Sequence, residues 1–152
     1  MPESNIVKEA VIKHGKKREN LMAVLQEIVK QENFLSEERL MEVGKEFNLS
    51  SAEVYGVATF YSFLPVKPMG ENVIKVCQTI VCDMKGKDAV MDAIKDKLNI
   101  TPGQTSADGK FSLIAVNCIG QCSNAPAMLI NDKPYINLTY ENVVKIIDEY
   151  QL

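Results

Sequence analysis

The sequence predicts an α/β protein in which a helical N-terminal part precedes a small mixed sheet. Apolar residues recur at helical spacing through residues 1–64, whereas short β-branched runs alternate with helical stripes further on. Between the two parts, Pro65, Pro68 and Gly70 mark a break. We therefore expect a helical domain over residues 1–64, a linker over 65–71 and a sheet domain over 72–152.

An amphipathic helix is expected first in the helical part. Its apolar face follows the i, i+3, i+4, i+7, i+8 pattern and consists of Leu21, Val24, Leu25, Ile28 and Val29. Ser36 is a suitable N-cap for a second helix, because two glutamates follow it in the first turn. The apolar stripe of that second helix consists of Leu40, Val43 and Phe47.

The third helix has the clearest start signal. Ser50 and Glu53 match a capping box, and Leu49 and Val54 hold the positions of a hydrophobic staple. The helix is expected to continue through residues 54–64 and to stop before Pro65. Its aromatic side chains are interpreted mainly as core, with some of them free to face a partner: Tyr55, Phe60, Tyr61 and Phe63.

The C-terminal part has the element order β-α-β-β-β-α, which suggests a small mixed sheet with helices packed on it. Strands are expected over residues 72–76, 110–117, 127–131 and 135–137, with a hairpin turn at Asn131 and Asp132. One helix is expected over residues 85–98, and a last helix after the N-cap Thr139. The inward positions of the first are Ala89, Val90, Ala93, Ile94 and Leu98.

All four cysteines fall into two close pairs, Cys77 with Cys82 and Cys118 with Cys122. Each pair follows a predicted strand, so both pairs can converge on one site. Four thiolates gathered in this way hold zinc or an iron–sulfur cluster. The grouping favours a [2Fe–2S] rhomb, because each of its two irons needs two protein thiolates. Structural zinc knuckles usually have two-residue spacers, whereas the spacers here have four and three residues.

Other interpretations of the cysteines stay open. A zinc-stabilised interaction module is one of them, and a set of unrelated buried thiols is another. Two disulfides are a third interpretation, but the N-terminus has no signal peptide, so a reducing cytoplasm is the expected location. Unrelated core cysteines would not be expected to fall into two close pairs.

Composition argues against several classes of function. The net charge of −3 gives no electrostatic reason to expect nucleic acid, and no apolar run is long enough to span a membrane. No G-x-G sequence occurs, so a dinucleotide fingerprint and a P-loop are absent. The single histidine, His14, is expected at the surface, within a solvated basic junction over residues 13–18. We expect no catalytic residue in this chain and a role in moving electrons.

Three segments together resemble one protein family: residues 54–63, the Cys77-x4-Cys82 motif with Gly86 after it, and residues 118–126. They are similar to the thioredoxin-like [2Fe–2S] subunit of NADH dehydrogenases (complex I) and of NAD-linked hydrogenases, including electron-bifurcating ones. The resemblance covers nearly the whole chain. It implies a thioredoxin-like [2Fe–2S] ferredoxin domain after the helical part, and one [2Fe–2S] cluster with these ligands: Cys77, Cys82, Cys118 and Cys122.

The resemblance also implies partners. One is an iron–sulfur flavoprotein subunit that carries FMN and the NAD(H) site, and the other is a larger iron–sulfur subunit of hydrogenase type. The chain would then have no catalytic site of its own. Its compactness, without a transit peptide or C-terminal extension, favours a soluble NAD-dependent hydrogenase over a respiratory NADH:quinone oxidoreductase. A free-standing ferredoxin would not need residues 1–64, which we expect to dock to other subunits.

Five residues near the cysteines are candidates for affecting a bound cluster. Gly120 lets its loop fold close to sulfur, and Gly86 either does the same or simply starts a helix. Lys85 and Lys87 either raise the reduction potential or are solvated surface residues. Many relatives have an acidic residue where this chain has Asn117, and its absence is expected to make a cluster slightly easier to reduce.

Overall fold

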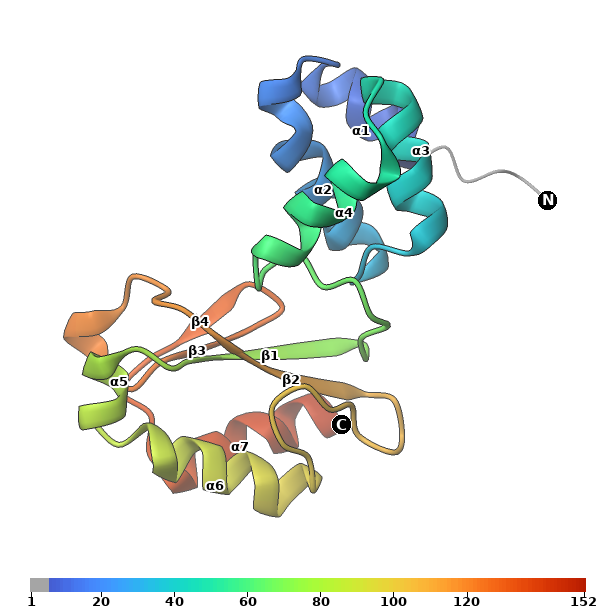
Figure 1. Cartoon of the computed structure of the whole chain (residues 1–152). Helices are drawn as coiled ribbons and strands as arrows, with labels where there is room; N and C mark the ends of the chain where they lie inside the picture. The colour runs from blue at the N-terminus through green and yellow to red at the C-terminus, as the bar shows by residue number, and fades with distance from the viewer. Residues whose placement is uncertain (1–5) are drawn as a thin grey trace. The chain divides into compact units, whose positions relative to one another are not determined.

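The computed structural model describes residues 6–152 and divides the chain into two compact units, with the boundary between Pro68 and Met69 (Figure 1). We call residues 6–68 the helical unit and residues 69–152 the sheet unit. The boundary falls within the expected linker, and each unit has its own hydrophobic core. No helix over the described residues combines the length and the apolar character needed to cross a bilayer.

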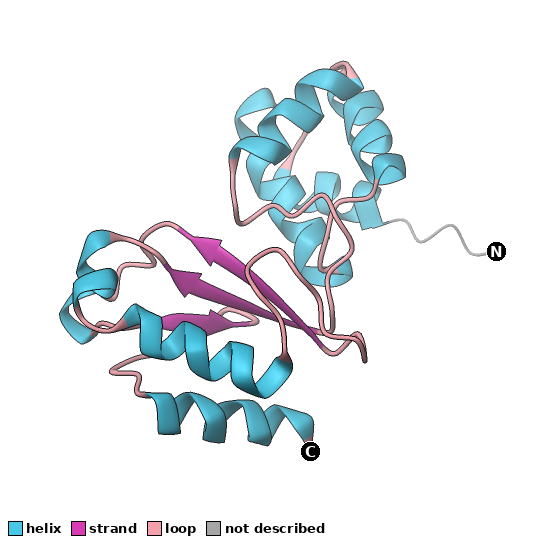
Figure 2. Ribbon diagram, turned by 60° about the horizontal axis from the view of Figure 1, so that its bottom comes forward, coloured by secondary structure: helices cyan, strands magenta, loops and turns pink. Residues whose placement is uncertain are grey.

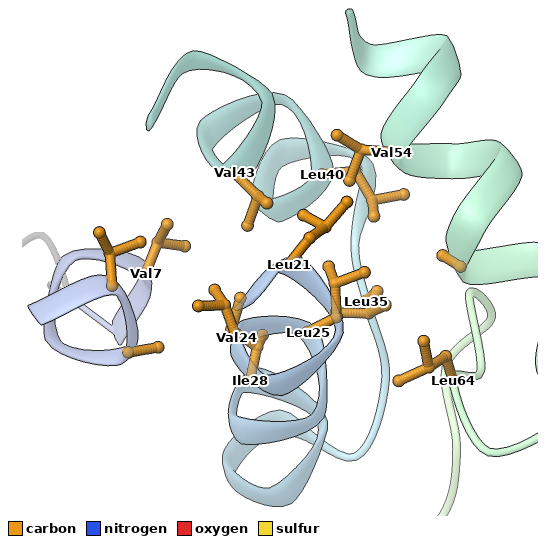
Figure 3. Close-up of a cluster of buried hydrophobic side chains, with 13 residues drawn as sticks. Val7, Leu21, Val24, Leu25, Ile28, Leu35, Leu40, Val43, Val54 and Leu64 are labelled. Atoms are coloured by element: carbon orange, nitrogen blue, oxygen red, sulfur yellow. The ribbon is translucent and has the colours of Figure 1, made fainter. Parts of the chain in front are cut away.

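The helical unit consists of α1 (Ile6–His14), the short 3-10 helix η1 (Arg18–Asn20), α2 (Leu21–Glu32), α3 (Glu37–Phe47) and α4 (Ser51–Phe60). The predicted apolar face of α2 forms the centre of the core. In Figure 3, the side chains of α2 lie between Val7 of α1 on one side and Val54 of α4 on the other. Four aliphatic side chains of α2 are fully or almost fully buried: Leu21, Val24, Leu25 and Ile28.

Two predicted helix starts are confirmed. The Ser36 hydroxyl accepts a hydrogen bond from the backbone N–H of Arg39, 3.3 Å away, at the start of α3. At α4, the Ser50 hydroxyl accepts from the Glu53 backbone, and the Glu53 carboxylate accepts from the Ser50 backbone. Both bonds of the predicted capping box are therefore present, and a cap of this kind contributes about 1 kcal/mol.

The end of α4 differs from the prediction. The helix stops at Phe60 rather than just before Pro65, because Tyr61 is already extended, with φ −104° and ψ 123°. The interpretation of the aromatic side chains as core is also wrong for three of them. Tyr55, Phe60 and Tyr61 are 50%, 80% and 45% exposed. Only Val54 and Ala58 of α4 are buried, so its buried face is too narrow to include its aromatic residues.

The basic junction between α1 and α2 carries more contacts than a solvated turn. Lys13 and His14 both contact the Glu27 carboxylate on α2, at 3.0 and 3.3 Å. The pKa of Glu27 is lowered, first by the hydrogen bond from Lys13 and then by that from His14. The His14 side chain is 28% exposed, so it lies at the surface as expected but is partly covered.

The sheet unit contains four strands and three α-helices in the described part of the chain. They are β1 (Asn72–Cys77), α5 (Ile80–Met84), α6 (Lys87–Leu98), β2 (Phe111–Val116), the 3-10 helix η2 (Cys122–Asn124), β3 (Met128–Ile130), β4 (Lys133–Tyr135) and α7 (Tyr140–Gln151). The strand order is β2-β1-β3-β4. β1 and β2 are parallel, and the other neighbours are antiparallel. The predicted mixed sheet is confirmed.

Helices α6 and α7 pack side by side on one face of this sheet (Figures 1 and 2). Alternate strand residues point into the core that they cover: Ile74, Val76, Phe111, Leu113, Met128 and Ile130. The helices contribute Val90, Ala93, Ile94, Val143 and Ile147. Ala89 was expected to face inward but is exposed, because α6 begins at Lys87 and buries a stripe that starts with Val90.

The predicted hairpin turn sets the position of the last strand. Asn131 and Asp132 both have positive φ, 48° and 72°, as in a two-residue type I′ turn. Such a tight turn pairs Ile130 directly with Lys133. Strand β4 therefore covers residues 133–135 and not the expected 135–137.

Gly70 lies where the chain enters the sheet unit, and its backbone approaches another backbone segment closely. A Cβ at this position would lie 2.7 Å from the Gly109 carbonyl oxygen and 3.0 Å from the Phe111 nitrogen. We expect Gly70→Ala to lower the free energy of unfolding by about 1–3 kcal/mol, as overpacking does. Gly56 is the matched control, because a Cβ there meets nothing within 4 Å.

We expect Gly56→Ala to raise the stability by about 1 kcal/mol, because alanine favours a helix interior. Urea unfolding followed by circular dichroism would measure both changes. Equal effects of the two alanines would contradict the close approach at Gly70.

Candidate metal centre

The two cysteine pairs meet at one edge of the sheet, as the sequence predicts. Cys77 is the last residue of β1 and pairs in register with Val116, the last residue of β2. Because β1 and β2 are parallel neighbours, their carboxyl ends lie together. Cys118 follows β2 after one residue, and its loop therefore starts beside Cys77.

One hydrogen bond links the loop of the second cysteine pair to the first pair. The backbone N–H of Ile119, in the loop between Cys118 and Cys122, donates to the Cys77 sulfur. The Cys77 and Cys82 side chains hydrogen-bond to each other. The sulfurs of Cys118 and Cys122 are 3.3 Å apart. The two sulfurs within each pair therefore contact each other, and the loop that carries the second pair is hydrogen-bonded to Cys77 of the first pair.

The two pairs differ in exposure, which sequence analysis did not foresee. Cys77 and Cys82 are buried, with 1% and 2% of their surface exposed. Cys118 and Cys122 are exposed. Cys77 belongs to the sheet and Cys82 to the buried side of α5, whereas the other pair lies on a surface loop. A group held by all four sulfurs would have one protected and one accessible side.

Neighbouring groups shift the pKa values of three thiols. Burial acts to raise the pKa of Cys77, but hydrogen bonds from the Thr79 side chain and backbone, and from Ile119, outweigh it and lower the pKa. Burial, followed by the bond to Cys77, raises the pKa of Cys82. The hydrogen bond with Cys118 raises the pKa of Cys122. Cys77 is therefore the thiol whose surroundings favour the thiolate that a metal requires.

Thr79 is a functional residue that sequence analysis missed. Its hydroxyl lies 3.1 Å from the Cys77 sulfur and donates to it when the sulfur is a thiolate. Thr79 is also the N-cap of α5, but its side chain makes no capping bond. The sequence signal that could have identified it is a threonine two residues after a candidate ligand and directly before a helix.

The predicted glycines take distinct roles. The Gly120 N–H donates to the Cys118 sulfur at 3.3 Å, and its φ of +80° is a conformation that favours glycine. This loop does fold close to sulfur. Gly86, with φ +104°, is the N-cap of α6, and its N–H donates to the Asp83 carbonyl oxygen. Gly86 therefore starts the helix. Lys85 and Asn117 are exposed.

The chemistry of the donor set fits a [2Fe–2S] cluster. Such a cluster has two irons, each of which takes two thiolates, and the cysteines here gather two and two. Over residues 6–152, no group of three or more His, Cys, Asp or Glu side chains surrounds a single metal position. Backbone and hydroxyl donors already point at two of the sulfurs, where they would stabilise thiolate charge.

Comparison with known proteins gives matches that span most of the chain. The family model of thioredoxin-like [2Fe–2S] ferredoxins matches residues 7–151. An NADH-quinone oxidoreductase subunit of Buchnera aphidicola subsp. Baizongia pistaciae is 32% identical over 134 residues, which are 88% of this chain and 78% of that protein. The subunit of the same name in Pseudomonas aeruginosa is 35% identical over 123 residues, 81% of this chain and 74% of that protein.

A solved structure aligns with residues from each of the two units. The NAD+-reducing [NiFe]-hydrogenase in its air-oxidized state aligns with a TM-score of 0.74 at 27% identity. The alignment covers 87% of this chain but only 23% of the hydrogenase chain. The match includes helical and sheet regions, because neither unit alone amounts to that share of the sequence.

Proposed function

Because this chain belongs to the thioredoxin-like [2Fe–2S] ferredoxin family, we propose that it is the electron-transfer subunit of an NAD(H)-linked oxidoreductase complex. Its cluster ligands are Cys77, Cys82, Cys118 and Cys122. The observation that carries the proposal is the convergence of the two cysteine pairs at the ends of the parallel strands β1 and β2. The identity with NADH-quinone oxidoreductase subunits supports the link to NADH.

The residues of the site have different roles in holding a charged group. The buried Cys77 and Cys82 anchor it within the fold, and Cys118 and Cys122 hold its accessible side. Donors from Thr79 and Gly120 stabilise the negative charge on sulfur. A [2Fe–2S] cluster supplies one-electron transfer when it is bound, without accepting a hydride.

Two parent complexes are compatible with the proposal. The names of the relatives favour a respiratory NADH:quinone oxidoreductase. The structural match favours an NAD-dependent hydrogenase, which the sequence analysis also preferred. Purification of the native complex, followed by identification of the subunits that accompany this chain, distinguishes them. In both cases FMN and the NAD(H) site belong to a partner flavoprotein.

The test of the function is anaerobic mixing with NADH. A cluster cannot take a hydride directly, so a flavin must separate the two electrons first. We expect NADH to leave the cluster of the isolated chain oxidised, whereas dithionite reduces it. Adding the flavoprotein partner is expected to produce a reduced-cluster EPR signal with NADH. Reduction by NADH in the isolated, flavin-free chain would mean that a nucleotide site exists on this chain.

A further inference from the structure

An ion pair lies directly beside the cysteine site. The Lys87 ammonium is 2.8 Å from a carboxylate oxygen of Asp83, the residue after Cys82. The pair links the end of α5 to the first turn of α6 across the Gly86 cap. Its two side chains differ in exposure, because the Lys87 side chain is 21% exposed and that of Asp83 is 54% exposed. The side chain of Lys87 is therefore covered more by its neighbours than that of Asp83.

The Lys87 charge also interacts with the site. The pKa of Lys87 is raised, first by the hydrogen bond to Asp83, and negative charge on Cys77 contributes to the same shift. The salt bridge to Asp83, which directly follows Cys82, places the Lys87 ammonium near this candidate ligand.

We propose that Lys87 and Asp83 set the reduction potential of the bound cluster in opposite directions. Reduction adds one negative charge to the cluster. The Lys87 ammonium stabilises that charge and raises the potential, whereas the Asp83 carboxylate opposes it and lowers the potential. This inference rests on the ligand set of the proposed function.

The two partners make the proposal testable by the sign of the change. We expect Lys87→Gln to lower the midpoint potential, because it removes the cation and leaves the carboxylate unpaired. We expect Asp83→Asn to raise the potential, because the ammonium is then no longer compensated. The midpoint potential of the double variant is expected to lie between those of the two single variants. Lys87→Arg keeps the positive charge, so its potential is expected to stay close to that of the wild type. The measurement is a dithionite titration of the full-length chain, monitored by EPR.

A second ion pair on the same helix is the matched control. Lys97 and Asp148 form a salt bridge near the other end of α6. Lys97 is ten residues beyond Lys87, which is about 15 Å along the helix axis and more than a Debye length at 0.1 M salt. We expect Lys97→Gln and Asp148→Asn to leave the potential unchanged. Raising the ionic strength is expected to shrink the difference between Lys87→Gln and Asp83→Asn.

The outcomes separate this inference from the proposed function. Iron and sulfide are measured in every variant before the titration. A wild-type chain without a cluster would contradict the ligand assignment itself. Loaded variants in which Lys87→Gln and Asp83→Asn shift the potential in the same direction, or not at all, would overturn the inference and leave the ligand assignment intact.

Discussion

Replacing Cys77 by serine is expected to abolish the iron and acid-labile sulfide content of the purified chain. Serine presents a harder and more basic oxygen, which is protonated at neutral pH where thiolate is needed. The position is only 1% exposed, so neither water nor another side chain can move in as a substitute. We expect the same loss for Cys82→Ser. The measurements are iron and sulfide per chain and the EPR signal after dithionite.

The exposed pair is expected to respond less uniformly. Cys118→Ser and Cys122→Ser change ligands that solvent reaches. We expect each variant either to lose its cluster or to keep a cluster with a strongly perturbed EPR signal. Ser123→Ala is the control, since it removes an exposed hydroxyl beside Cys122 and is expected to keep full iron content. Stoichiometric zinc without iron in anaerobically prepared wild-type protein would contradict the cluster and favour a zinc-stabilised module.

Deleting residues 1–68 is expected to leave the cluster signal intact and to abolish assembly with the partner subunits. The sheet unit retains all four cysteines and a separate core formed by its own strands and helices. The helical unit, by contrast, has exposed aromatic side chains on α4 that its own core does not use. We propose that this unit docks to other subunits, a role that the sequence analysis expected of residues 1–64. Co-purification of the tagged, truncated chain with its partners measures assembly.

A point variant separates docking from folding. Phe60 is 80% exposed, so Phe60→Ser removes apolar surface without opening the core. We expect this full-length variant to bind its cluster normally and to assemble more weakly. Normal assembly of the truncated chain would refute the docking role of residues 1–68.

The elements that could be predicted are those with a local signal. Ser50 and Glu53 predict the start of α4, and Asn131 and Asp132 predict a turn, because each of these signals is complete within a few residues. Helix α5 was missed because it has five residues and buries only Cys82. Without an apolar stripe it has no periodicity to detect. The aromatic residues of α4 were misjudged because composition does not distinguish an aromatic side chain at the surface from one in the core.

At the site, sequence analysis anticipated the convergence of the cysteines but not their surroundings. The strand patterns before Cys77 and Cys118 were sufficient to bring both pairs to one sheet edge. The contact of Thr79 with Cys77 depends on how α5 turns away from β1, and the burial of one pair depends on packing across the unit. Such features depend on tertiary structure and cannot be inferred from the spacing of residues along the chain.

The exposure of the Cys118 and Cys122 sulfurs affects the insertion of iron into the newly made protein. Before iron is inserted, dissolved oxygen can remove two electrons and two protons from this pair and close a disulfide. The sulfurs, 3.3 Å apart, need to approach only to a bond length of about 2.05 Å. The buried pair is shielded from the same oxidant. A chain oxidised in this way would lack half of its ligands until a thiol reductant reopened the bond. We therefore expect iron insertion to need either the exclusion of air or a thiol reductant.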